Sequence, residues 1–319
     1  MRPQRELGQR NRPTVGGSMT VCIAVRSEGM IILLSDRMIT SGDIEFEPPT
    51  SKIIALTTSI GMMYSGDSSL FAEIAQELIA DVRARIGEDP GHWLRVRDVA
   101  FLYAKHWNEA RLRRADIDVL APYGLTRKTY AQDVMKLDPK VSEKISSELE
   151  KYSVPTVEVI IAGIDLRYGV SAPAPSIYHV FEGSPMCADQ AAFAAIGTGG
   201  RHAESQFMLA KYAGTVLNGE ALLLAYSAKR DAEVAPGVGK ETDVFVFGGN
   251  VGNFFKLPDI LMKKLEDEYQ KVRLKDAQVR KKARTEVTRY LGELQREAPK
   301  AQQVSPTAGT AIGTSEASG

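Results

Sequence analysis

The sequence contains few of the residues from which many catalytic and structural sites are built. Its 319 residues include two cysteines, Cys22 and Cys187, and four histidines. Two cysteines are too few for a disulfide framework or for a zinc site with four cysteine ligands, and such a chain is typical of a reducing compartment. The histidines form no HExxH motif and no other ligand spacing. These absences predict a cytoplasmic protein without a histidine-based catalytic centre.

Long apolar runs and an excess of charge of one sign are also missing. No apolar stretch approaches the roughly 20 residues that a membrane-spanning helix needs. The first twenty residues lack the apolar centre of a secretory signal. Forty basic side chains balance forty acidic ones, whereas a nucleic-acid-binding protein normally carries an excess of Lys and Arg. We therefore expect neither a membrane nor a nucleic acid as partner.

Two glycine-rich segments are too incomplete to indicate nucleotide binding. In the segment GVGKET (237–242), Val234 stands where a phosphate-binding loop has its first glycine, and Glu241 follows the lysine in place of Ser or Thr. The segment GTGG (197–200) lacks the third glycine of a dinucleotide-binding turn. We interpret GTGG as a tight turn from a strand to a helix.

The hydrophobic pattern between residues 20 and 257 predicts one α+β domain. Two pairs of strand-like runs come first, and two amphipathic helices follow, with Asp67 as a plausible N-cap of the first. Because the strands come as adjacent hairpins, the sheets should be antiparallel, with a pair of helices over each outer face. We expect a four-layer α/β/β/α sandwich, in which the later strands form the second sheet. Those later strands are expected at 157–165, 176–182, 190–200 and 242–249, and the second pair of helices at 201–217 and 220–231.

The remaining segments are predicted to be additions to this domain. Residues 116–155 are mostly polar and broken by prolines, which favours a helical insertion on the surface. Residues 258–298 are highly charged with a thin apolar seam, which is typical either of a helix lying on its own domain or of a helix that binds a partner. The ends, 1–19 and 299–319, have the small and polar composition of disordered tails.

One threonine stands where it could act as a nucleophile. Thr20 lies at the start of the first strand, and if everything before it were removed, its own α-amine could take the hydroxyl proton. Such a site needs a buried lysine that stabilises negative charge on the hydroxyl oxygen, and an aspartate that holds the lysine charged. Asp36 ends the second strand-like run and Lys52 begins the third, so hairpin geometry could bring both beside Thr20.

These spacings resemble those of proteasome β-type subunits, a family of N-terminal-nucleophile hydrolases. When Thr20 is counted as the first residue, Asp36 is the seventeenth, Lys52 the thirty-third and Gly66 the forty-seventh. That family has its catalytic Asp and Lys and its oxyanion-hole glycine at these places. The segments LLSDRMITSG, YSGDSSLF, VIIAGID and AAIGTGG are similar to further landmarks of the family. The resemblance covers roughly residues 20–257, and the insertion and terminal helix are closest in style to the Anbu and betaproteobacterial homologues.

The resemblance implies a role for each matching residue. Thr20 would be the nucleophile, tuned by Asp36 and Lys52, and the Gly66 N–H would stabilise the tetrahedral oxyanion. Thr198 and Asp231 would support the N-terminal amine.

Two further positions would bind the substrate. Thr40 would pair its backbone with an extended peptide, and Tyr64 would lie near the pocket for the residue before the cut bond. No metal or organic cofactor is implied.

The expected function is that of a threonine peptidase, which cleaves peptide bonds inside a homo-oligomeric ring fed by an ATPase, unfoldase or adaptor. Two alternatives stay open: an amidohydrolase of the same superfamily that acts on a small amide, and a catalytically silent ring or scaffold subunit. Self-cleaving members of the family carry Gly before the threonine, whereas this chain has Met19. Our hypothesis is that translation begins at Met19 and that methionine aminopeptidase then exposes Thr20.

Overall fold

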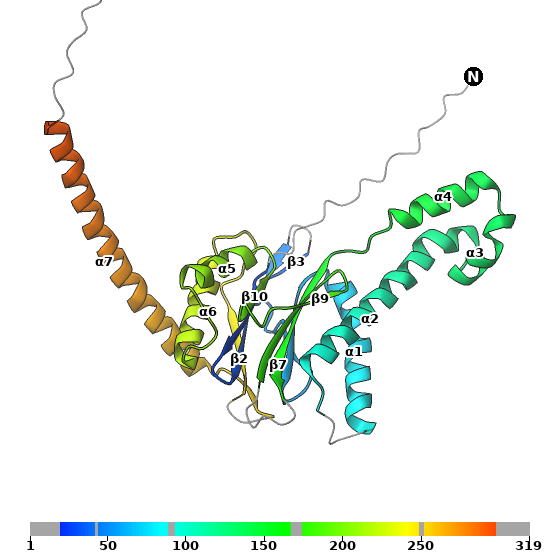
Figure 1. The fold of residues 1–319 in the computed structure, drawn as a ribbon, viewed down its shortest axis with the longest axis horizontal. Helices are drawn as coiled ribbons and strands as arrows, with labels where there is room; N and C mark the ends of the chain where they lie inside the picture. The colour runs from blue at the N-terminus through cyan, green and yellow to red at the C-terminus, as the bar shows by residue number, and fades with distance from the viewer. Residues whose placement is uncertain (1–19, 42–43, 89–92, 167–173, 249–251, 298–319) are drawn as a thin grey trace, which may run out of the picture. The chain divides into compact units, whose positions relative to one another are not determined.

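The computed structural model describes residues 20–41, 44–88, 93–166, 174–248 and 252–297. The expectations for the two tails fall outside these residues. Within them the chain forms an α+β fold with two five-stranded antiparallel sheets, a separate two-stranded hairpin and seven α-helices (Figure 1). No helix in this described part is both long enough and apolar enough to cross a membrane.

The first sheet has the strand order β10-β1-β2-β11-β12. Its strands are β1 (Cys22–Ser27), β2 (Met30–Asp36), β10 (Phe193–Ile196), β11 (Thr242–Gly248) and β12 (Phe254–Lys256). The second sheet has the order β5-β6-β7-β8-β9. Its strands are β5 (Ile53–Ala55), β6 (Ile60–Gly66), β7 (Val157–Asp165), β8 (Ala174–Phe181) and β9 (Ser184–Cys187). The hairpin pairs β3 (Ile39–Ser41) with β4 (Ile44–Phe46).

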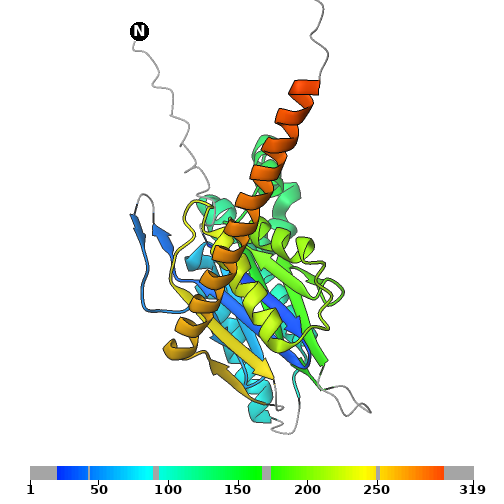
Figure 2. The same cartoon turned by 90° about the vertical axis from the view of Figure 1, so that its left-hand side faces the viewer.

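Three apolar clusters show how the sheets and helices are layered. One cluster joins the inner faces of the two sheets, with Leu33 and Phe247 from the first sheet and Ile160 from the second. A second lies between the first sheet and the helices α5 (Gly200–Leu209) and α6 (Asn218–Ala232). These helices face the viewer in Figure 2. A third lies between the second sheet and α1 (Ser68–Glu88) and α2 (Val96–Ala115). This order of layers is compatible with the predicted sandwich.

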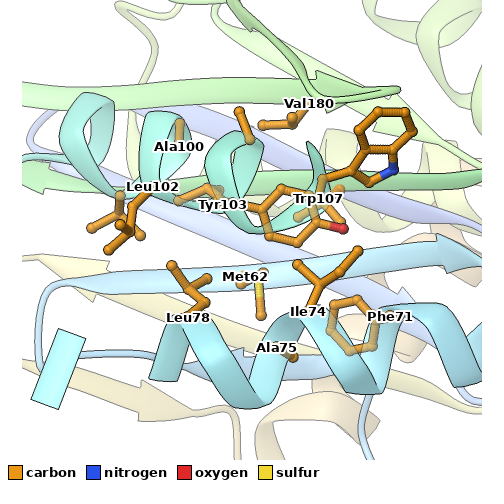
Figure 3. Close-up of a cluster of buried hydrophobic side chains, with 14 of the residues drawn as sticks. Met62, Phe71, Ile74, Ala75, Leu78, Ala100, Leu102, Tyr103, Trp107 and Val180 are labelled. Carbon is orange, nitrogen blue, oxygen red and sulfur yellow. The ribbon is translucent and has the colours of Figure 1, made fainter. Parts of the chain in front are cut away.

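The third cluster shows why the sequence forms helices here. Leu70, Ile74, Leu78 and Val82 recur every fourth residue of α1, and all are buried. They pack with α2 and with strand β6, as Figure 3 shows for Ile74, Leu78 and Met62. The Asp67 carboxylate accepts a hydrogen bond from the Leu70 N–H at 2.7 Å, which confirms Asp67 as the N-cap.

Two parts of the sequence prediction were wrong. The later strands do not form a sheet by themselves: β7 and β8 continue the sheet of β5 and β6, whereas β10 pairs with β1. Hydrophobic alternation predicts that a segment is a strand, but it does not indicate which other strand pairs with it. Tertiary packing determines that pairing. The helix predicted over 201–217 also ends early, at Leu209, because Lys211 and Gly214 both have positive φ angles that a helix does not allow.

The predicted insertion carries a small core of its own. The π-helical turn Asp116–Leu120 continues α2, and α3 (Arg127–Asp133) and α4 (Pro139–Glu150) follow. Val119, Leu120 and Ile145 are buried together at the centre of these pieces. The residues of the predicted insertion therefore form helices around a small core.

The predicted terminal helix is α7 (Asp259–Glu297). The chain divides into two compact units at Tyr269, so the first turns of α7 belong to the first unit. There Tyr269 is buried against α6, and its ring meets the Tyr226 ring edge-on at 5.9 Å between centroids. This part of the helix lies on its own domain, which is the first of the two interpretations of the sequence.

Candidate active site

The two hairpins that open the domain bring three polar side chains together in a buried cluster. Thr20 lies just before β1, Asp36 is the last residue of β2, and Lys52 lies just before β5. The Thr20 hydroxyl donates a hydrogen bond to Asp36 Oδ1 and accepts one from Lys52 Nζ. Lys52 Nζ also lies 2.9 Å from Asp36 Oδ1. The structure thus assembles the three residues that the spacing singled out.

Asp36 is the hub of this cluster. Its side chain is fully buried, and besides Thr20 and Lys52 it accepts three backbone N–H groups. The Val21 N–H reaches Oδ1 at 3.0 Å, while those of Met38 and Gly239 reach Oδ2 at 3.2 and 2.9 Å. A buried carboxylate is tolerated only when its oxygens are paired and hydrogen-bonded in this way. These contacts fix the orientation of the carboxylate toward the Thr20 hydroxyl.

The GTGG turn closes the cluster from the other side. Thr198 lies in this turn between β10 and α5, and its hydroxyl oxygen accepts a hydrogen bond from the Thr20 backbone N–H at 3.2 Å. The Gly199 N–H donates to the Thr20 carbonyl at 3.1 Å. A Cβ on Gly197, whose φ is +86°, would lie 2.7 Å from Thr20 Cγ2, so only glycine allows this approach. The interpretation of GTGG as a strand-to-helix turn is confirmed.

Gly66 ends β6 in a conformation that strongly favours glycine. Its φ is +117°, and a Cβ there would collide with the Thr156 carbonyl and lie 2.9 Å from Val157 Cα. These contacts explain why glycine stands at this position. The assignment of the Gly66 N–H to an oxyanion hole stays a prediction.

We expect Gly66→Ala to destabilise the fold. An alanine would combine an unfavourable φ with a backbone clash, each costing about 1–3 kcal/mol. The free energy of unfolding, measured with urea, should therefore fall by at least about 2 kcal/mol. Gly87→Ala is the matched control, since this helical glycine has open space around it. Equal stability of the two variants would contradict this account of Gly66.

The two predicted substrate-binding residues lie on strands β3 and β6. Thr40 belongs to β3 and pairs with Glu45 of β4 in the two-stranded hairpin. Tyr64 lies on β6, where its ring stacks on the Phe71 ring at 3.7 Å between centroids. Tyr64 is connected to the site through its backbone, because its carbonyl accepts a hydrogen bond from the Cys22 thiol at 3.4 Å. The substrate roles of Thr40 and Tyr64 stay predictions.

Asp231 is placed on α6, and its carboxylate accepts a hydrogen bond from the Tyr269 hydroxyl at 3.5 Å. This contact ties Asp231 to the first turns of α7. The sequence resemblance assigned Asp231 to the support of the Thr20 amine. That role also stays a prediction.

Cys22 is a second nucleophilic side chain beside the cluster, but its surroundings keep it protonated. Burial raises the pKa of the thiol to about 12, and the neighbouring Asp36 carboxylate adds to this effect while the Lys52 ammonium opposes it. Because the thiolate is the reactive form, Cys22 is inert at neutral pH. The role of the Thr20 hydroxyl as the nucleophile stays a prediction.

The two cysteines should consequently differ in reactivity. With iodoacetamide at pH 8, we expect exposed Cys187 to be alkylated and buried Cys22 to stay unmodified in the folded protein. Peptide mass spectrometry measures both, and alkylation in denaturant serves as the control in which both react. Modification of Cys22 in the native protein at the rate of Cys187 would contradict the buried, protonated thiol.

Sequence reasoning missed a second buried lysine. Lys229 is fully buried on α6, and its Nζ donates to Glu233 Oε1 at 2.7 Å and to the carbonyls of Gly239 and Lys240 at 2.9 and 2.8 Å. A signal for it was present in the sequence. Lys229 lies on the same face of the helix as the buried Ala225 and Ala232, where a lysine is out of place unless it is paired.

A charge cluster next to Asp36 was also missed. Arg37 donates two hydrogen bonds to the buried Asp243 carboxylate, at 3.1 and 2.7 Å, and Lys256 Nζ lies 2.6 Å from it. Burial raises the pKa of Asp243, but the hydrogen bonds from Arg37 and Lys256 outweigh burial and hold it below its usual value. This cluster joins β2 to β11 one residue beyond Asp36.

In the part of the chain that the structure describes, no three His, Cys, Asp or Glu side chains are grouped so that they could hold a metal ion. No protein-family model matches the chain, and no curated protein is similar enough to it to count as a relative.

Proposed function

We propose that the protein is an N-terminal-nucleophile hydrolase of the proteasome β type, a threonine peptidase whose nucleophile is Thr20. The observation that carries the proposal is the buried contact of the Thr20 hydroxyl with both Asp36 and Lys52. A solvent-exposed or structural threonine has no need of a buried ion pair at its hydroxyl. Two antiparallel sheets between helical layers are compatible with the sandwich of that hydrolase class.

The proposed reaction begins with the removal of everything before Thr20. In the unprocessed chain the Thr20 nitrogen is an amide, which cannot accept a proton. Once freed, its amine takes the hydroxyl proton through a water molecule, while the Lys52 ammonium stabilises the negative charge that builds up on Oγ. Oγ then attacks the substrate carbonyl, and the Gly66 N–H stabilises the resulting oxyanion.

The second half of the reaction releases the enzyme. The tetrahedral intermediate expels the leaving amine, which takes up the proton held by the Thr20 amine, and an ester on Oγ remains. Water, deprotonated by the same amine, hydrolyses this ester and restores the hydroxyl. In this scheme Thr198 orients the amine by the contact it already makes with the Thr20 nitrogen.

The proposed setting is the cytoplasm and the interior of a homo-oligomeric ring. A protease of low specificity must be confined to such an interior, because in free solution it would cleave the exposed loops of neighbouring folded proteins. The substrate is a peptide or an unfolded chain, supplied by an ATPase, unfoldase or adaptor.

The direct test compares two forms of the same protein. One form keeps residues 1–19, and the other begins at Thr20 after cleavage of an N-terminal fusion by a specific protease. We expect hydrolysis of fluorogenic peptides by the second form alone, because only its Thr20 carries a free amine. Hydrolysis of small amides without peptides would favour an amidohydrolase, and inactivity of both forms would favour a silent scaffold subunit.

A further inference from the structure

Lys229 stands out because it is a buried cation that the proposed reaction does not use. Its three ammonium hydrogens match three acceptors: one Glu233 carboxylate oxygen and the carbonyls of Gly239 and Lys240. Burial lowers the pKa of Lys229, while the Glu233 and Asp36 carboxylates oppose the shift. A buried charge is costly, and this one is retained beside the catalytic cluster.

The segment that Lys229 holds also touches the site. The Gly239 carbonyl accepts from Lys229, and the Gly239 N–H donates to Asp36 Oδ2 at 2.9 Å. Gly239 is packed tightly, since a Cβ there would lie 2.9 Å from Met38 Cβ and would collide with the Glu47 carboxylate. One residue thus connects the buried lysine of α6 to the hub of the cluster.

We propose that Lys229 is a positioning residue, which holds the segment 239–240 so that the Gly239 N–H fixes the Asp36 carboxylate in the orientation that Thr20 and Lys52 require. This inference depends on the proposed function. Without the Gly239 N–H, Asp36 Oδ2 loses one of the two backbone donors that hold it, and the carboxylate is held less firmly in its orientation toward Thr20. A displacement of about 1 Å in a catalytic group can reduce the rate about a hundredfold.

A purely structural role for Lys229 makes a different prediction. If the lysine only fastened α6 to the segment, its loss would lower the folded fraction without changing the turnover of correctly folded molecules. The experiment must therefore count active sites. Covalent labelling of Thr20 gives that count, and kcat per labelled site separates positioning from stability.

Three variants carry the test. Lys229→Met keeps the length of the side chain but removes the charge and the hydrogen bonds. Glu233→Gln keeps Lys229 but weakens one of the contacts that hold its ammonium group in place. It replaces Lys229→Met in the test if that variant fails to fold. Tyr226→Phe is the matched control, because it removes a partly buried hydrogen bond to Glu266 from the same helix without touching the segment 239–240.

Two measurements are made on each variant: kcat and KM for a fluorogenic peptide, and hydrogen exchange of the backbone amides of residues 237–243. For Lys229→Met we expect a fall in kcat per site of about 10- to 100-fold, with KM changed less than about twofold, and faster exchange of the Gly239 amide. For Glu233→Gln we expect smaller changes in the same direction. For Tyr226→Phe we expect the values of the unmodified protein.

The exchange measurement separates the two proposals. If the processed protein is inactive, the proposed function fails, and exchange alone decides whether Lys229 holds the segment. If the protein is active and Lys229→Met retains both kcat per site and slow exchange of the Gly239 amide, the positioning role of Lys229 is overturned. A fall in stability with unchanged kcat per site overturns it as well.

Discussion

Thr20→Ala, introduced into the form that begins at residue 20, is expected to reduce peptide hydrolysis by at least about a thousandfold. The substitution removes the only atom that forms a covalent bond with the substrate in the proposed reaction. It should have little effect on stability, because alanine fits the space and Asp36 keeps Lys52 and three backbone N–H groups as partners. Initial rates with a fluorogenic peptide and thermal unfolding of the same samples measure the two effects.

Thr20→Ser is the matched control for this experiment. Serine keeps the hydroxyl and, once it is N-terminal, the amine, and it loses only a methyl group. We expect measurable activity from Thr20→Ser, above that of Thr20→Ala by at least about a hundredfold. Equal rates for Thr20→Ala and the unmodified protein would contradict Thr20 as the nucleophile.

Asp36→Asn is expected to lower both activity and stability. Asparagine presents an NH2 group where the carboxylate now accepts hydrogen bonds, and it leaves the buried Lys52 ammonium without its counter-charge. Breaking a buried pair from one side costs about 3–5 kcal/mol. We therefore expect the free energy of unfolding in urea to fall by about that amount, and kcat per folded molecule to fall about a hundredfold or more.

Asp243→Asn is the control that separates the effect of Asp36→Asn on activity from its effect on stability. Asp243 is also a buried carboxylate of the first sheet, but its partners are Arg37 and Lys256. The control should lose stability while the molecules that stay folded retain their kcat. If the two variants showed the same kcat per folded molecule, Asp36 would have no special part in the reaction.

The hairpins and helices of the fold could be predicted from the sequence, because their signals are local. Gly29 marks the turn between β1 and β2, and the four-residue spacing of Leu70 to Val82 marks α1. The pairing of β10 with β1 could not be predicted, since the two strands are far apart in the chain and their pairing has no local signature. The strands β3, β4, β9 and β12, each of four residues or fewer, were also missed.

Part of the candidate site could be predicted from the sequence for the same reasons. Thr20, Asp36 and Lys52 were found because each lies at the end of a strand-like run, where hairpin geometry limits the distance between them. Lys229 and Gly239 were not found, because their connection to Asp36 depends on a loop that only the folded chain brings to β2. Lys229 could have been suspected from its position on the apolar face of α6.

The most direct test of the central claim is the chemical identity of the residue that an epoxyketone inhibitor modifies. This inhibitor reacts with both the hydroxyl and the free amine of an N-terminal threonine. Intact-mass measurement followed by peptide mapping should show one adduct per chain, on Thr20, in protein that begins at that residue. The absence of an adduct in that form, or an adduct on any other residue, would contradict the account.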